Sequence, residues 1–171
     1  MGKTYWLMKS EPSAYSISDL IRDTVTCWDG VRNYQARNFM RDNMQVGDGV
    51  LFYHSNILPP GIAGEAVITR TSYPDYTAWD TKDPHYDPKS CSDRPIWFMV
   101  DVQFVRECRK IITLVTLKET PGLEGMEVVK RGSRLSVSPV SHGEWKIITN
   151  LSQWGHSPPA VMTGLVGPKK N

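Results

Sequence analysis

The sequence predicts an α+β fold, a small mixed β-barrel with helices packed around it. Three observations lead to this prediction. Apolar strand-like runs recur at irregular spacing, segments with helical periodicity lie between them, and 171 residues suit one domain with a sizeable core. The sequence contains no internal repeat, no glycine-rich phosphate loop and no paired-carboxylate pattern on an evident helix.

The composition narrows the classes of protein to which the chain can belong. A net charge of +2 and a sequence pI of about 8.4 are mild for a protein that grips a long duplex by its phosphates, so any nucleic-acid contact should be short or depend on a pocket. Three cysteines without CxxC spacing favour a reducing compartment over a disulfide framework. The sequence shows no apolar run of bilayer length and no signal pattern, so we expect a soluble, intracellular, cytoplasmic protein without a membrane partner.

The first predicted strand covers residues 4–8, and apolar residues on both of its sides place it at the centre of the sheet. Lys9 and Ser10 follow, and a proline ends the ladder two residues later. These two polar residues belong either to a solvated strand end or to the mouth of a pocket. Ser16 then caps a short helix, and Asp19 favours its positive end.

The segment from Trp28 to Asn38 organises the rest of the predicted fold. The tryptophan is followed by an Asp-Gly turn and by Asn33, which is a good N-cap for the next helix. One face of that helix is apolar and consists of Ala36, Phe39, Met40 and Met44. An aromatic plate, a turn and the positive end of a helix thus come together and can stack a flat ligand. The alternative is that Trp28 only fills the core beneath the turn.

Residues 50–56 are predicted to form a strand that runs from the core to the rim of a pocket. Its polar second half makes Tyr53, His54 and Ser55 candidates for a pocket wall. A histidine at a strand end is nevertheless more often a structural group than a catalyst. A further strand is predicted over residues 61–71.

Residues 73–95 form a long loop rich in Asp, Pro and aromatic residues, and loops of this length are usually functional or disordered. Asp83, His85 and Asp87 match no closed zinc pattern, and no cysteine pair accompanies them. We therefore expect no metal site in the loop, and nothing in the sequence indicates a cofactor.

A strand over residues 96–105 alternates between apolar and other residues, so one of its faces should belong to the core. Thr113 is predicted to cap a short helix within residues 112–118. Alternation returns in residues 133–140, where Arg134 and Ser136 point the same way. The face that they share is either exposed, as is common in antiparallel sheets, or part of a pocket.

The last predicted helix begins at a capping box formed by Ser141 and Glu144. Its apolar face consists of Trp145, Ile148 and Leu151. From residue 155 onward the chain turns to Pro, Gly and Lys, and we expect this tail to fray.

Six segments occur together and in order as they do in one known family. They are residues 5–12 (YWLMKSEP), 28–38 (WDGVRNYQARN), 47–48 with 52–55 (GD, FYHS), 73–75 (YPD), 84–88 (PHYDP) and 134–140 (RLSVSPV). The chain resembles the EVE domain, a member of the PUA-like group that also includes the YTH domain. The resemblance covers residues 4 to about 154 and suggests a bacterial member.

The resemblance implies a PUA-like β-barrel of five or six strands wrapped by helices, with one deep pocket, over residues 1–155. It leaves residues 156–171 as a flexible tail. It also implies a non-catalytic module that takes a modified, flipped-out base of DNA or RNA, such as a modified cytosine or methyladenine, into the pocket. The ligand-binding residues that it implies are Trp28, Asn33, Lys9, Ser10, Tyr53, His54, Ser55, Arg134 and Ser136. Arg32 and Arg37 are candidates for phosphate contacts.

Two alternatives remain beside this hypothesis. A small enzyme acting on a nucleotide or RNA could draw acid, base or metal ligands from Lys9, His54, Asp83 and His85, although no spacing fixes a mechanism. A protein-interaction module could instead use the aromatic residues of the long loop. The sequence leaves the protein partners and the oligomeric state open.

Overall fold

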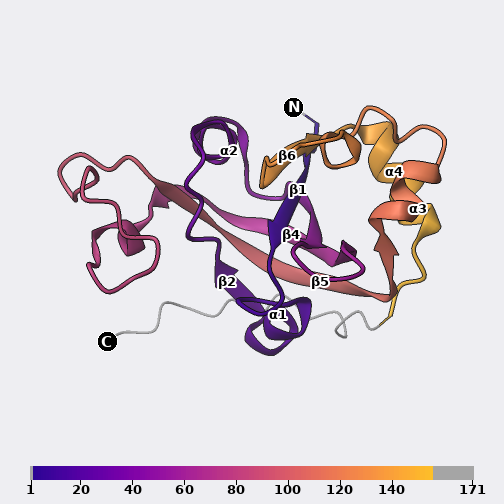
Figure 1. Ribbon diagram of the computed structural model, residues 1–171, viewed down its shortest axis with the longest axis horizontal. Helices are drawn as coiled ribbons and strands as arrows, with labels where there is room; N and C mark the ends of the chain where they lie inside the picture. The colour runs from indigo at the N-terminus through magenta and orange to yellow at the C-terminus, as the bar shows by residue number, and fades with distance from the viewer. Residues whose placement is uncertain (1, 156–171) are drawn as a thin grey trace.

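The computed structural model describes residues 2–155, and this part of the chain forms one mixed sheet of six strands with four α-helices (Figure 1). The strands are β1 (Tyr5–Ser10), β2 (Val25–Cys27), β3 (Gly49–His54), β4 (Gly61–Pro74), β5 (Phe98–Thr113) and β6 (Val137–Val140). Their order is β2-β5-β4-β3-β1-β6, and only the β1–β3 pair is parallel. The α+β class is confirmed.

The sheet is open among the described residues and is not a closed barrel. β2 pairs only with β5, and β6 pairs only with β1, so these two short strands form the edges. β4 and β5 are long and pair with four register shifts. Such bulges bend and twist a sheet without closing it.

The helices begin where the sequence predicts caps. They are α1 (Ile17–Asp23), α2 (Tyr34–Asn38), α3 (Leu114–Glu119) and α4 (His142–Leu151). Ser16 and Ser141 each form a capping box, and the side chains of Asn33 and Thr113 each accept a hydrogen bond from a first-turn N–H group. A π-helical turn (Phe39–Asn43) continues α2, and two 3-10 turns cover Tyr76–Trp79 and Glu127–Val129.

The strand ends differ from the prediction, most clearly in β1, β5 and β6, and the sequence analysis predicts no strand at β2. β1 continues through Lys9 and Ser10, because these residues pair in parallel register with Tyr53 and His54. β5 continues to Thr113, which pairs with Gly61 at the beginning of β4. The basic residues between 106 and 110 therefore lie inside the strand. β6 begins only at Val137, so the polar residues predicted on this strand precede it.

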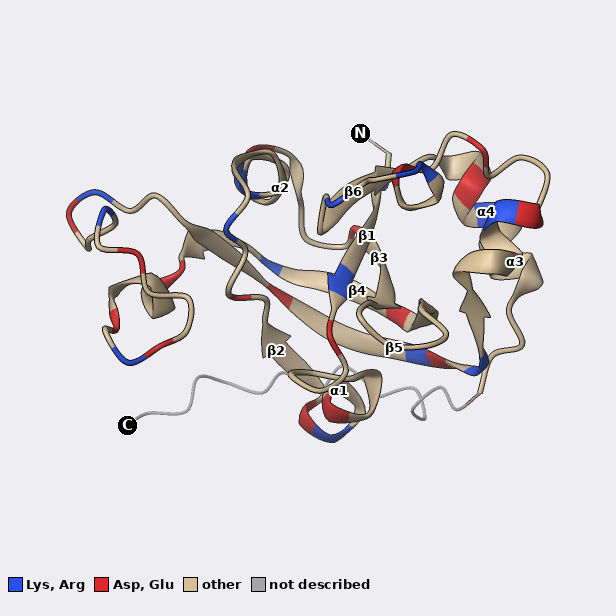
Figure 2. Cartoon of the chain, in the orientation of Figure 1, with Lys and Arg blue, Asp and Glu red and all other residues tan. Residues whose placement is uncertain are grey.

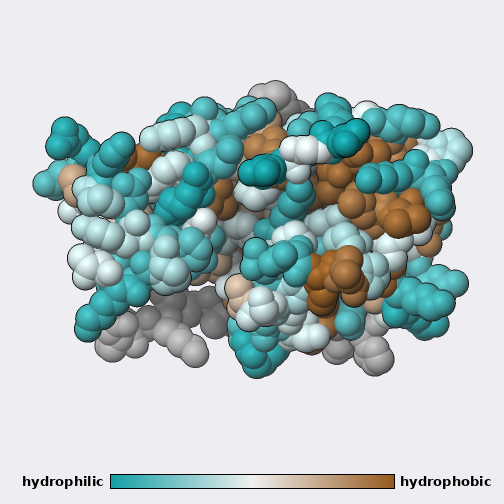
Figure 3. All heavy atoms as spheres, in the orientation of Figure 1, coloured by the Kyte–Doolittle hydropathy of each residue, from teal (hydrophilic) through white to brown (hydrophobic). Residues whose placement is uncertain are grey.

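Two hydrophobic clusters lie on opposite faces of the sheet, as alternation along the strands requires. The side chains of Trp6 and Met8 belong to the cluster beneath α1 and α2, whereas Leu7 between them belongs to the cluster beneath α3 and α4. The face drawn in Figure 3 shows a hydrophobic area over α3 and α4. Leu151, predicted on the buried face of α4, is instead exposed.

No helix within residues 2–155 has the length and apolar character that crossing a membrane requires. The tail predicted at residues 156–171 lies outside the described residues.

Candidate functional site

A pocket of about 750 Å³ opens where segments far apart in the sequence meet. The end of β1, the end of β2 with the turn that follows it, the loop at residues 83–85 and the segment before β6 all contribute. Seven of the predicted site residues line it: Lys9, Ser10, Trp28, Arg32, Ser55, Arg134 and Ser136. This volume falls in the range of about 300–1,000 Å³ that is usual for small-ligand sites.

Trp28 lies at the base of this pocket. Its side chain is buried and meets Phe52 edge-on, with ring centroids 5.3 Å apart. Its backbone N–H group donates a 2.7 Å hydrogen bond to the carbonyl oxygen of Val100, which holds the residue against β5. Both interpretations of the sequence therefore apply, because this tryptophan is part of the core and also lines the pocket.

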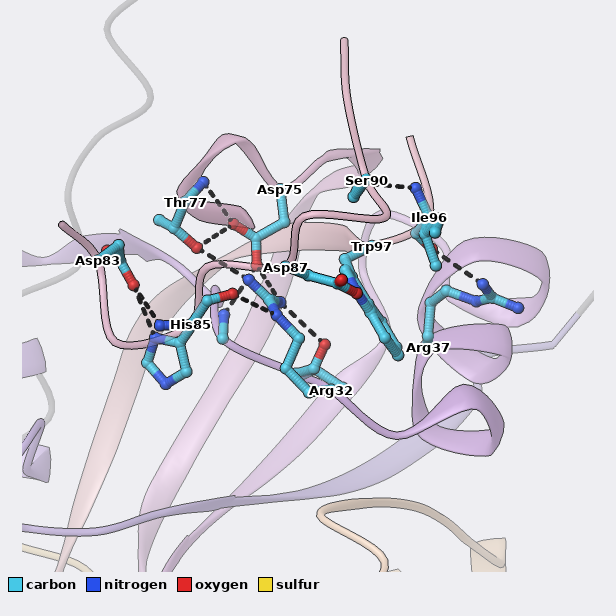
Figure 4. A network of polar contacts seen from close by, with 12 residues as sticks. Arg32, Arg37, Asp75, Thr77, Asp83, His85, Asp87, Ser90, Ile96 and Trp97 are labelled. Atoms are coloured by element: carbon cyan, nitrogen blue, oxygen red, sulfur yellow. Dashed lines mark hydrogen bonds and ion pairs between the residues drawn. The ribbon is translucent and has the colours of Figure 1, made fainter. Parts of the chain in front are cut away.

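A buried carboxylate fixes the turn that follows Trp28. Asp75 accepts hydrogen bonds from the backbone N–H of Gly30 at 2.8 Å, from Arg32 at 2.9 Å and from both the N–H and the hydroxyl of Thr77 (Figure 4). Burial alone raises the pKa of Asp75, but the hydrogen bonds from Thr77, Arg32 and Gly30 outweigh it and lower the pKa.

Arg32, the ion-pair partner of Asp75, also fixes this turn. Its Nε donates to the carbonyl oxygen of His85 at 2.8 Å, and its two Nη atoms donate to Val31, Asp75 and Thr77. All three guanidinium nitrogens therefore have protein partners (Figure 4). Arg32, predicted to contact phosphate, joins the 28–32 turn to the long loop instead, and we regard it as a positioning residue.

Arg37, the other arginine predicted to contact phosphate, lies outside the pocket lining. Its guanidinium donates to the carbonyl oxygen of Ile96 at 2.9 Å and to the side chain of Asn38. It lies 4.9 Å from the ring centroid of Tyr34 and 5.8 Å from that of Trp97. Burial lowers the pKa of Arg37, with Arg41 adding to the effect.

His85 brings the long loop against the turn. Gly30 has a φ of 76°, and a Cβ atom built there would lie 2.8 Å from two atoms of the His85 ring. The Nδ1 atom of His85 is 3.1 Å from an oxygen of Asp83. Within residues 2–155, no group of three potential metal ligands gathers here or elsewhere.

We call the assembly of Trp28–Arg32, Asp75, Thr77 and His85 the clamped wall. We call the opposite side, formed by Lys9, Ser10, Ser55, Arg134 and Ser136, the open wall.

Main-chain hydrogen bonds and one side-chain hydrogen bond hold the open wall together. The Ser10 hydroxyl donates to the carbonyl oxygen of Tyr15 at 2.6 Å. The N–H of Lys9 donates to Ser136 at 2.8 Å, and the N–H of Ser55 donates to Ser10 at 3.0 Å. Burial lowers the pKa of Lys9, and Glu127 opposes this shift. Arg134 is exposed, and its guanidinium makes no hydrogen bond or ion pair with any of the residues that the structure describes. Figure 2 shows the positions of basic residues along β1, β4 and β5.

Three predicted ligand residues lie outside the pocket lining. The side chain of Asn33 accepts from the N–H of Ala36 at 3.0 Å, which confirms it as a helix cap. Tyr53 is buried in the cluster beneath α3 and α4. The Nε2 atom of His54 accepts from the N–H of Ile17 at 3.1 Å, and burial lowers the pKa of this histidine, so the neutral form is favoured. β3 therefore stays buried to its end, contrary to the expected course from core to rim.

Several residues that line the pocket are not among the site residues predicted from the sequence. Asp29 was interpreted only as part of a turn, although a carboxylate beside an aromatic pocket residue was a usable signal. His85 and Asp83 were considered only for metal or acid–base chemistry. No local pattern marked the remaining members, which include Glu11, Tyr15, Thr26 and Cys27.

The chain is similar in sequence and in fold to several known proteins. The family model described as EVE domain matches residues 4–151. Human thymocyte nuclear protein 1 is 44% identical over 169 residues, which cover 88% of this chain and 74% of that protein. A crystal structure of a Pseudomonas syringae protein has a TM-score of 0.84 and 48% identity, covering 86% of this chain and 98% of that one.

A further crystal structure shows human THYN1 protein in complex with 5-methylcytosine containing DNA. It has a TM-score of 0.81 and 44% identity, and it covers 87% of this chain and 97% of that chain. The matching proteins thus come from bacteria and from eukaryotes.

Proposed function

This chain belongs to the EVE domain family, and we propose that it is a non-catalytic reader that takes one modified base, flipped out of a nucleic acid, into the pocket between the clamped wall and the open wall. The observation that carries this proposal is the pocket itself, where buried Trp28 adjoins polar side chains from several elements. The complex of human THYN1 protein with 5-methylcytosine containing DNA supports DNA as the partner and 5-methylcytosine as the first base to test.

The energetics of base flipping are compatible with such a pocket. Extrusion of a base costs a few kcal/mol, and stacking on an aromatic side chain contributes about 1–3 kcal/mol. Burial of one methyl group adds only about 0.8 kcal/mol. A methyl group alone therefore gives modest selectivity, and polar groups that read the edge of the base must supply the rest.

The geometry favours this function over the proposed enzyme. His54, the histidine that sequence reasoning offered as an acid or base, is buried and occupied by the N–H of Ile17. His85 lines the pocket, but its ring packs on Gly30 and its Nδ1 faces Asp83. Neither arrangement presents a nucleophile and base within hydrogen-bond reach of each other.

The test is fluorescence-polarisation binding of short single- and double-stranded oligonucleotides that carry one cytosine, 5-methylcytosine, oxidised cytosine or methyladenine. Trp28→Phe should weaken binding of the preferred modified base by about tenfold, since stacking area is lost. Trp145→Phe is the matched control, because Trp145 is equally buried but belongs to the cluster on the other face of the sheet. Weak binding to every oligonucleotide, unchanged by Trp28→Phe, would contradict the reader function.

A further inference from the structure

We propose that Asp29 reads the edge of the flipped base and that one proton is held between its carboxyl group and a ring nitrogen of the base. This inference rests on the proposed function and deepens it. A carboxyl group that shares a proton in this way favours bases that present an amino donor beside an unprotonated ring nitrogen. Cytosine and adenine have such an edge, and thymine does not.

The position of Asp29 is set by both of its neighbours. Trp28 before it is buried at the base of the pocket, and the N–H of Gly30 after it is bound to Asp75. Asp29 itself lines the pocket and is exposed to it. A carboxylate is thus held beside the aromatic surface on which a base would stack.

Asp29 differs from the other carboxylates of this region in its contacts. Asp75 is bound to Arg32, Asp83 to His85 and Asp87 to the indole of Trp97. By contrast, the side chain of Asp29 has neither a hydrogen bond nor an ion pair with another residue of the 2–155 region. Within that region, its own backbone N–H is the only hydrogen-bond donor that acts on the carboxylate, which therefore keeps acceptor positions for a ligand.

The surroundings of Asp29 raise the pKa of its carboxyl group. Partial burial raises this pKa, and the charges of Asp75 and Asp83 raise it further, while the charge of His85 and a hydrogen bond from the backbone N–H of Asp29 itself oppose the shift. The remaining titratable or charged groups around it are Cys27 and Tyr76 on its own side, and Lys9, Glu11, Arg32 and Arg134 in the pocket lining. A carboxyl group in this setting takes up a proton at a higher pH than an ordinary aspartate does.

The chemistry of the bases determines what such a group selects. A protonated carboxyl group can donate its O–H to the N3 of cytosine while its other oxygen accepts from the exocyclic amino group. Because cytosine N3 is unprotonated, this pair needs one proton from solvent. Thymine presents the reverse edge, with an N3–H donor beside the O4 acceptor. Its N3–H can bind the ionised carboxylate as well as the protonated group, so thymine binding depends less on an added proton.

The matched ligands are therefore 5-methylcytosine and thymine, which share the ring methyl group and differ only in the edge. We would measure their affinities in otherwise identical single strands, which removes the cost of opening a duplex, between pH 5.5 and 8. For the wild type, the preference for 5-methylcytosine should fall as the pH rises, with a limit of about tenfold per pH unit for one linked proton.

Asp29→Asn is the decisive variant, because an amide donates and accepts without any added proton. It should make the preference independent of pH, and Asp29→Ala should weaken 5-methylcytosine binding about tenfold or more at pH 5.5. Glu11→Gln removes a different carboxylate from the pocket lining and should keep the wild-type pH dependence.

A preference that does not change with pH in the wild type, or a pH dependence that persists in Asp29→Asn, overturns the assignment of Asp29. The second outcome would point to His85 or Glu11 as the titrating group. Absence of binding to every oligonucleotide instead overturns the proposed function and this inference with it, so the two failures are distinguishable.

Discussion

The two walls of the pocket are held in place by different means. The clamped wall depends on side chains, since buried Asp75 binds the backbone of Gly30 and the guanidinium of Arg32. The open wall depends mainly on the backbone, since Lys9 pairs with Ser136 through main-chain atoms, although the Ser10 hydroxyl also donates to the carbonyl oxygen of Tyr15. One wall therefore uses its polar side chains to fix its own shape.

This difference separates two tasks within one site. The clamped wall sets the position of the aromatic surface and of Asp29, so changes there should alter stability and recognition together. On the open wall the Arg134 guanidinium has no partner among residues 2–155, so changes there should alter affinity with little effect on folding. Four predictions test this separation, in order of decreasing effect.

The largest effect is expected from Asp75→Asn. This change leaves Arg32 facing a neutral group in a buried position, and breaking a buried ion pair costs about 3–5 kcal/mol. Urea denaturation would measure the loss of unfolding free energy, and base binding should weaken as well. Asp42→Asn is the control, because its ion pair with Arg41 is exposed and should matter little. Equal effects of the two variants would show that the clamp does not hold the wall.

The same carboxylate predicts a dependence of stability on pH. The folded-state pKa of Asp75 is lowered, so its contribution is complete above the unfolded value of about 3.9 and is lost as the pH falls through the folded value. The difference in unfolding free energy between the wild type and Asp75→Asn should therefore shrink in acid. A difference that grows in acid would contradict the assignment.

An intermediate effect is expected from Gly30→Ala. Gly30 and Gly132 share a φ of 76°, so alanine at either site should cost about 1–2 kcal/mol from backbone strain. Only at Gly30 would the new Cβ collide with the His85 ring, whereas nothing lies within 4 Å at Gly132. We expect Gly30→Ala alone to weaken base binding, measured by polarisation, and to lose more stability than Gly132→Ala. Identical behaviour of the two variants would remove His85 from the wall.

The smallest effect is expected from Arg134→Gln on the open wall. Stability should change by less than about 0.5 kcal/mol, because Arg134 is exposed. If Arg134 contacts one phosphate, the slope of log affinity against log salt should fall by about 0.7–0.9. Arg131→Gln, an exposed arginine outside the pocket lining, should leave the slope unchanged. A slope equal in both variants would place the phosphate contact elsewhere.

Local patterns in the sequence predicted much of the fold. The caps at Ser16, Asn33, Thr113 and Ser141 are confirmed, because a cap is a contact between a side chain and the backbone three residues away. Alternation and helical spacing also predicted the order of the other strands and helices, but not the short edge strand β2. The resemblance to the EVE domain placed Trp28, Lys9 and Arg134 near one pocket, and all three line it.

Only the tertiary structure decided how each polar side chain is used. Arg32 meets Asp75 across 43 positions and His85 across 53, and no local pattern reports such pairs. The same holds for His54, whose partner Ile17 lies 37 positions away. The sequence determined by itself where the capped helices begin and most of the apolar faces, because those properties depend on neighbouring residues. Whether a polar residue fixes the shape of the pocket or stays available to a ligand depends on which groups distant in the sequence it meets. Only the folded chain brings those groups together.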